Sequence, residues 1–172
     1  MVLVIDGQIA GISGDMFLSA LVNMGANKSK VIDGAHLTEN YLKGSKIKKI
    51  DFEKIVKHGT EATYLNLEIE ESHHERKGLD IQECILLSSD KIGLSDTAKV
   101  FAKESVRSLL LAESKIHGEP IESVHFHEAS SIDTAIDIIT FNGELGVISD
   151  QIIEIIHEKY LRGRKFYNQN SW

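Results

Sequence analysis

The sequence predicts an α+β protein, and three observations support that class. Residues 95–116 and the segment after Ser131 repeat apolar residues at helical spacing, whereas residues 62–69 alternate polar and apolar side chains like a strand. A second strand candidate, 46–56, precedes it with His58-Gly59 between them, which favours an antiparallel hairpin. The order of elements reduces to βαββαβ plus a C-terminal helix, as in a ferredoxin-like two-layer sandwich. A doubly wound α/β sheet is the alternative, but it requires parallel strands.

The N-terminal part is predicted as a strand, a loop and two helices. Residues 2–5 are apolar and read as a short buried strand, followed by a glycine-rich loop over 7–14. Ser13 is a suitable N-cap for a helix over 15–24, which Gly25 ends. A second helix is expected over 28–42.

The remaining elements follow from similar signals. Helices are expected over 79–88 and 95–116, with Gly118 ending the second, and residues 121–126 read as a strand after the only proline. The last amphipathic helix starts at Ser131, and 148–157 could form another. We predict one α+β domain over residues 1–142 and a divergent C-terminal tail over 143–172.

Composition and charge exclude several classes of protein. The 172 residues carry a formal charge of −7 and lack a basic stripe with interleaved aromatics, so nucleic acid is not an expected partner. No apolar run reaches the roughly 20 residues of a membrane span, and no signal peptide is recognised. The single cysteine, Cys84, fits a reducing, cytoplasmic location.

The stretch HFHE at the end of the predicted strand 121–126 is the first candidate site. Residues i and i+2 of a strand face the same way, so His125 and His127 should project together, with Phe126 opposite and Glu128 close by. Two imidazoles and a carboxylate can ligate a borderline divalent metal. The alternative is a polar strand end with incidental histidines.

Two further groups of ligand-type residues are less specific. His73 and His74 lie on a polar loop and could bind a metal, but adjacent histidines on a loop are more often solvated. Asp133 and Asp137 share one face of the last helix and could extend a metal site. Helix capping is the simpler explanation for Asp133, because Ser130-x-x-Asp133 matches a capping box.

The loop GISGD between the first strand and the first helix is a candidate phosphate site. Gly11, Ser13 and Gly14 would let backbone N–H groups approach an anion at a helix N-terminus. No lysine follows as in a Walker motif, and Asp15 would repel a phosphate unless a cation lies between them. A tight turn capped by Ser13 is the simpler explanation from residue chemistry alone.

With these stretches in view, the chain resembles the N-terminal region of the LarC-type nickel insertion proteins, from about residue 2 to about residue 139. The resemblance is carried by four segments, GISGDMFLSALVNMGA (11–26), GTEATYLNLEIEESHHERKGLDI (59–81), AESKIHG (112–118) and VHFHEASSIDTAIDII (124–139).

The resemblance implies a chelatase of the lyase class. Such a protein inserts Ni²⁺, its substrate metal, into a pyridinium bis-thiocarboxylate mononucleotide to make the nickel-pincer cofactor, and it consumes CTP. His125, His127 and Glu128, with His73 and His74, become the expected metal ligands. Gly11, Ser13, Gly14 and Asp15 become the expected phosphate or substrate loop.

The chain also departs from the family pattern. The family has a denser histidine cluster around the position of His73, and CTP with its divalent cation is associated with a C-terminal domain that does not follow here. We therefore expect a metal- and substrate-handling N-terminal half that works with a C-terminal half on a separate chain, and a homo-oligomer is compatible with these observations. The alternative is a nickel or zinc carrier or sensor without turnover. In the sandwich, the Asp15 loop and the His127 strand end would form two separate patches.

Overall fold

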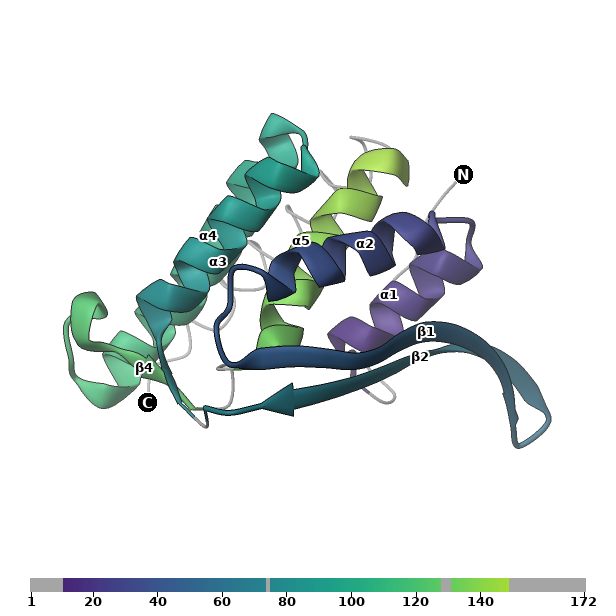
Figure 1. The fold of residues 1–172 in the computed structure, drawn as a ribbon, viewed down its shortest axis with the longest axis horizontal. Coiled ribbons are helices and arrows are strands. Elements are labelled where there is room, and N and C mark those ends of the chain that lie inside the picture. Colours follow the sequence, from purple (N-terminus) through teal and green to yellow (C-terminus); the bar gives the residue numbers. More distant parts are fainter. Residues whose placement is uncertain (1–10, 74, 128–130, 149–172) are drawn as a thin grey trace, which may run out of the picture.

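The protein is described by a computed structural model that covers residues 11–73, 75–127 and 131–148 (Figure 1). Helices gather on one side of a long β-hairpin, and a second, very small sheet lies beside α3 and α4. The elements in chain order are α1 (Gly14–Asn23), α2 (Lys28–Glu39), β1 (Ser45–Lys57), β2 (Thr60–Glu71), β3 (Arg76–Lys77), α3 (Gly78–Ile92), α4 (Asp96–His117), the 3₁₀ turn η1 (Ile121–Ser123), β4 (His125–Phe126) and α5 (Ile132–Ile148).

The hairpin of β1 and β2 forms where the sequence predicts it. The strands pair antiparallel along their whole length and turn at His58 and Gly59, whose φ angles are +51° and +78°. Positive φ at both residues is what a tight two-residue hairpin turn requires, so the predicted turn is confirmed. Phe52 and Leu65, opposite each other in the register, pack beneath α1 and α2 with Leu18 and Val31.

Helix α5 lies at the centre of the core. It contacts α1, α2, α3 and α4. Its apolar stripe is almost completely buried, as the spacing predicts, and consists of Ile132, Ala135, Ile136 and Ile139. The four helices pack around α5, and Ile47 of the hairpin belongs to the same continuous core. No helix in the described part of the chain combines the length and apolar character of a membrane span.

The α+β class is confirmed, but the ferredoxin-like topology is not. Within the described residues the strands form two separate two-stranded antiparallel sheets, β1–β2 and β3–β4, rather than one four-stranded sheet. No parallel pairing, which the doubly wound alternative needs, is found among these strands. The predicted strand 2–5 and the possible helix 148–157 lie outside the described residues, apart from Ile148 at the end of α5.

The predicted strand 121–126 is mostly not a strand. After Pro120 the chain turns through η1, with Ser123 N–H donating to the Pro120 carbonyl at 2.9 Å. Only His125 and Phe126 pair with another strand, and their partner β3 is equally short. The local 3₁₀ turn satisfies backbone groups that a longer strand would have paired across a sheet.

We predict that Phe126→Ala destabilises the fold by about 3–5 kcal/mol, because the ring is fully buried among core residues. Urea unfolding followed by circular dichroism would measure the loss. Phe101→Ala, at a half-buried position on α4, is the matched control, and its free energy of unfolding should fall clearly less. Equal losses in the two variants would contradict the packing described here.

Candidate functional site

A cavity of about 600 Å³ lies where β3, the start of α3 and the α2–β1 turn meet. Two of the predicted metal ligands, His73 and His125, line it together. Its other lining residues are Tyr41, Leu42, Lys43, Glu75, Arg76, Lys77, Asp80 and Glu83. The cavity therefore joins two histidines that are 52 positions apart with carboxylates and cationic side chains.

His125 reaches the cavity because of the short β3–β4 ladder. His125 pairs with Lys77, and Phe126 pairs with Arg76. Alternation along the strand then sends His125 outward and Phe126 into the core, where it is 0% exposed. Gly78 allows this close packing: a Cβ there would lie 2.3 Å from Leu110 and 3.4 Å from the Phe126 ring. The predicted opposite orientation of His125 and Phe126 is confirmed, since Phe126 is buried and His125 is exposed.

His73 is held by the turn between α2 and β1. Ser72 donates to the Gly44 carbonyl through its backbone N–H at 2.8 Å and its hydroxyl at 2.9 Å. Gly44 has a φ of +86°, and a Cβ at this position would lie 2.4 Å from the His73 ring. Only glycine combines that backbone conformation with so close an imidazole.

The side chains of the cavity suit two kinds of ligand at once. Imidazole nitrogens and carboxylate oxygens from Glu75, Asp80 and Glu83 are ligand types for a divalent metal. Lys43 and Lys77 offer positive charge to an anion. In the residues that the structure describes, no group of three or more histidine, cysteine or acidic side chains is arranged to hold a metal ion.

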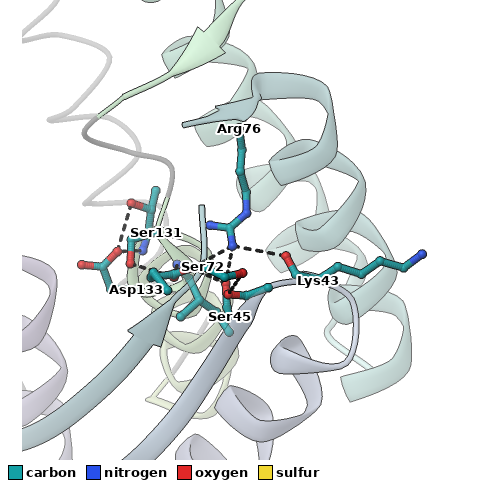
Figure 2. A network of polar contacts seen from close by, with 10 residues as sticks. Lys43, Ser45, Ser72, Arg76, Ser131 and Asp133 are labelled. Carbon is teal, nitrogen blue, oxygen red and sulfur yellow. Dashed lines mark hydrogen bonds and ion pairs between the residues drawn. The ribbon is translucent and has the colours of Figure 1, made fainter. Parts of the chain in front are cut away.

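One wall of the cavity is fixed by Arg76, which is only 6% exposed. Its guanidinium donates at 2.7 Å to Glu71, at 2.8 Å to the Ser45 hydroxyl and at 3.2 Å to the Lys43 carbonyl (Figure 2). These hydrogen bonds direct the guanidinium toward groups of the protein and not toward a ligand in the cavity. Arg76 therefore shapes the cavity, and its charge is largely balanced by Glu71.

Glu71 also holds the start of α5. Its second carboxylate oxygen accepts hydrogen bonds from Ile132 N–H at 2.9 Å and from the Ser131 hydroxyl at 3.1 Å. Burial opposes the charged form, but the Ile132 N–H, Arg76 and Ser45 outweigh it and hold the pKa of Glu71 below its ordinary value. The N-terminus of α5 is thus capped by a distant glutamate. Ser130, the first residue of the expected capping box, lies outside the described residues.

The glycine loop lies elsewhere, where α1 approaches α5. Ser13 donates a hydrogen bond to Asp15, and a Cβ on Gly14 would lie 1.9 Å from a carboxylate oxygen of Asp137. Burial, followed by the nearby charges of Asp133 and Asp15, raises the pKa of Asp137 to about 7. The start of α1 therefore adjoins carboxylates, and a phosphate there would meet negative charge. Ser13 stands at the N-cap of α1, but its side chain makes no capping hydrogen bond to the helix backbone.

The predicted site residues thus fall into distinct places. His73 and His125 share the cavity, while His127 lies beside it, with its ring 3.6 Å from a Glu75 oxygen. Gly11, Ser13, Gly14 and Asp15 are at or just before the start of α1, whereas His74 and Glu128 lie outside the described residues. Sequence reasoning missed Lys43, Asp80 and Glu83. The sequence signal that could have found two of them is the three-residue spacing of Asp80 and Glu83, which puts both on one face of α3. Lys43 has no such signal.

Comparison with known proteins identifies the family of this α+β chain. The family described as nickel insertion protein matches residues 3–153. The chain therefore belongs to the nickel insertion protein family, as its HFHE and GISGD stretches indicate.

Curated relatives agree with this assignment. A pyridinium-3,5-bisthiocarboxylic acid mononucleotide nickel insertion protein from Staphylococcus epidermidis is 40% identical over 132 residues, 76% of this chain and 31% of its own length. A protein of the same name from Geobacillus kaustophilus is 36% identical over 140 residues, 76% of this chain and 32% of its length. A putative nickel insertion protein from Dictyoglomus thermophilum is 36% identical over 130 residues, again 76% and 31%. The chain spans about a third of these relatives, and no solved structure matches it.

We predict that Glu71→Gln lowers the free energy of unfolding by about 3 kcal/mol, because it removes the carboxylate charge that lies 2.7 Å from the buried Arg76 guanidinium. The depressed pKa of Glu71 stabilises the fold above the ordinary value of 4.5, and this contribution is lost as the pH falls through the folded value. Urea titrations at pH 7 and at lower pH should therefore show that the difference in free energy of unfolding between wild type and variant becomes smaller in acid. Glu70→Gln, which removes only an exposed ion pair with Lys48, is the neighbouring control and should change little.

A second prediction concerns Asp137. Its pKa is raised from 3.8 to about 7, so the folded state binds this proton more tightly, and wild-type stability falls as the pH rises between these values. Asp137→Asn removes this titrating group. The free energy of unfolding of the variant should therefore rise relative to that of wild type by up to about 1.4 kcal/mol per pH unit in that interval. Thermal unfolding at pH 5 and pH 8 measures the divergence, with the exposed Asp33→Asn on α2 as control. Parallel pH profiles for wild type and Asp137→Asn would contradict it.

Proposed function

We propose that this chain is the metal- and substrate-handling N-terminal part of a nickel insertion enzyme, a chelatase that makes the nickel-pincer mononucleotide cofactor. The observation that carries the proposal is the cavity in which His73 and His125 meet carboxylates and lysines, in a chain of the nickel insertion family. Ni²⁺ is the substrate metal in this reaction, and the pyridinium bis-thiocarboxylate mononucleotide named for the relatives is its acceptor.

The cavity lining suits both components of such a reaction. The acceptor carries a phosphate and two thiocarboxylates, and Lys43 and Lys77 can balance this negative charge. The two imidazoles are neutral nitrogen ligands that favour a late transition metal over Mg²⁺. Side chains of both kinds around one cavity would bring the ion and the thiocarboxylate sulfurs into a common volume, which lowers the entropic barrier to transfer.

The CTP-dependent step belongs, in this proposal, to a C-terminal half that lies outside this N-terminal part. The described start of α1 has no lysine after the GISGD loop and adjoins Asp137, so it is poorly suited to a triphosphate. His73 and His125 would present the ion, and the lysines would orient the acceptor. Activation of the acceptor by CTP would occur before or during docking of the other half.

We predict that the chain binds Ni²⁺ more tightly than Mg²⁺, and that the double variant His73→Ala/His125→Ala weakens Ni²⁺ binding at least about tenfold. Isothermal calorimetry measures both effects. His36→Ala removes another exposed histidine, on α2, and is the matched control.

The transfer itself is tested by adding the purified C-terminal half of a family member, CTP, Mg²⁺ and the mononucleotide. Formation of the nickel adduct with wild type but not with the double variant supports the proposal. Nickel binding without any adduct would instead favour a nickel or zinc carrier or sensor. Equal binding of Ni²⁺ and Mg²⁺ would contradict a site built on His73 and His125.

A further inference from the structure

Tyr41 is anchored in the core and also lines the cavity. It follows the C-cap of α2, is half-buried, and packs against the main apolar cluster. Among the described residues that line the cavity with His73 and His125, Tyr41 is the one with a benzene-type ring. From this placement we infer that Tyr41 is the surface on which the cationic pyridinium ring of the acceptor stacks, an inference that rests on the proposed function for the identity of the ligand.

The backbone on both sides of Tyr41 is held in place. Its N–H donates to the Thr38 carbonyl at 3.0 Å, and the next residue, Leu42, is buried in the core. The Lys43 carbonyl, one residue further on, accepts a hydrogen bond at 3.2 Å from the buried Arg76. A ring that is presented from such a fixed turn loses little conformational freedom when a flat ligand lies on it, and this preorganisation favours stacking.

The charges around the ring match a ligand that carries both signs. A pyridinium ring is aromatic and positively charged, so the electron-rich face of a tyrosine ring attracts it. The cavity also has Asp80 and Glu83 on one face of α3, and their carboxylates favour a cationic ring. Lys43 and Lys77 favour the phosphate and the acid groups of the same mononucleotide. A purely basic lining would suit a phosphate but would oppose the ring.

Stacking makes a different demand on Tyr41 from hydrogen bonding by its hydroxyl. The cavity volume of about 600 Å³ lies within the about 300–1,000 Å³ of small-molecule sites, so a ring and a phosphate fit together. A hydroxyl that bound the phosphate would be lost in Tyr41→Phe, whereas a stacking face would be kept. Tyr41→Leu keeps an apolar side chain in the core and removes the aromatic face. The two variants therefore separate the two roles.

The stacking is tested with nicotinamide mononucleotide, which has the pyridinium ring, ribose and phosphate of the acceptor without its sulfur atoms. The 1,4-dihydro form of this probe keeps the ribose and phosphate but has an uncharged ring. In titrations of the whole chain followed by NMR, wild type should bind the pyridinium form about three- to tenfold more tightly than the dihydro form. Tyr41→Phe should keep this preference, and Tyr41→Leu should lose it. Equal affinities of wild type for the two forms, or a preference that survives in Tyr41→Leu, would overturn the inference.

The probe's own signals give a second readout that a merely structural role of Tyr41 would not affect. The ring protons of the bound pyridinium form should shift upfield, through the ring current of the tyrosine, in wild type and in Tyr41→Phe but not in Tyr41→Leu. Tyr64→Leu, at an exposed tyrosine on β2, is the matched control and should behave like wild type. Absence of the upfield shift in wild type and Tyr41→Phe would overturn the inference, even if nickel transfer occurs. Upfield shifts without nickel transfer would support the role of Tyr41 and count against the proposed function alone.

Discussion

The carboxylate of Glu71 is the constraint on which the arrangement of the site depends. One oxygen takes the buried guanidinium of Arg76 and the Ser45 hydroxyl, and the other takes the first backbone N–H of α5. A single side chain therefore ties together the end of the hairpin, β3 and the central helix. Because Arg76 lies between Glu75 and Lys77, the position of these two cavity residues is set by the same contacts.

Buried and exposed side chains alternate on the two short strands beside the cavity. On β3 and β4, alternation buries Arg76 and Phe126 and leaves Lys77 and His125 exposed on the cavity side. The buried pair fixes the backbone, so the exposed pair is presented from a rigid base although the ladder is only two residues long. The charged lining can then remain solvated until a ligand enters.

The sequence was sufficient for elements whose signal is local. Helical spacing, the helix end at Gly118 and the His58-Gly59 turn depend on residues close together in the chain, and the structure agrees with them. The i and i+2 pattern likewise predicts which way His125 and Phe126 face. The ferredoxin-like sheet could not be tested by such patterns, because a two-residue strand such as β4 leaves too little periodicity to reveal its partner.

Which residues line the cavity was harder to predict from the sequence, for a related reason. Glu71 caps a helix that begins 61 residues later, and no pattern around either residue marks that contact. Lys43, Asp80 and Glu83 are ordinary charged residues in sequence and become significant only because the α2–β1 turn and α3 meet His73 and His125. Long-range packing decides which polar residues of a chain become neighbours.

The central position of α5 has a consequence for synthesis on the ribosome. This helix is the last of the described elements to emerge, yet it completes the apolar surfaces of α1, α2, α3 and α4. Until it emerges, those four helices expose the surface that it will cover, and the hairpin end lacks the N–H group that Glu71 caps. The nascent protein therefore has its strongest need for chaperone protection just before residues 132–139 leave the exit tunnel.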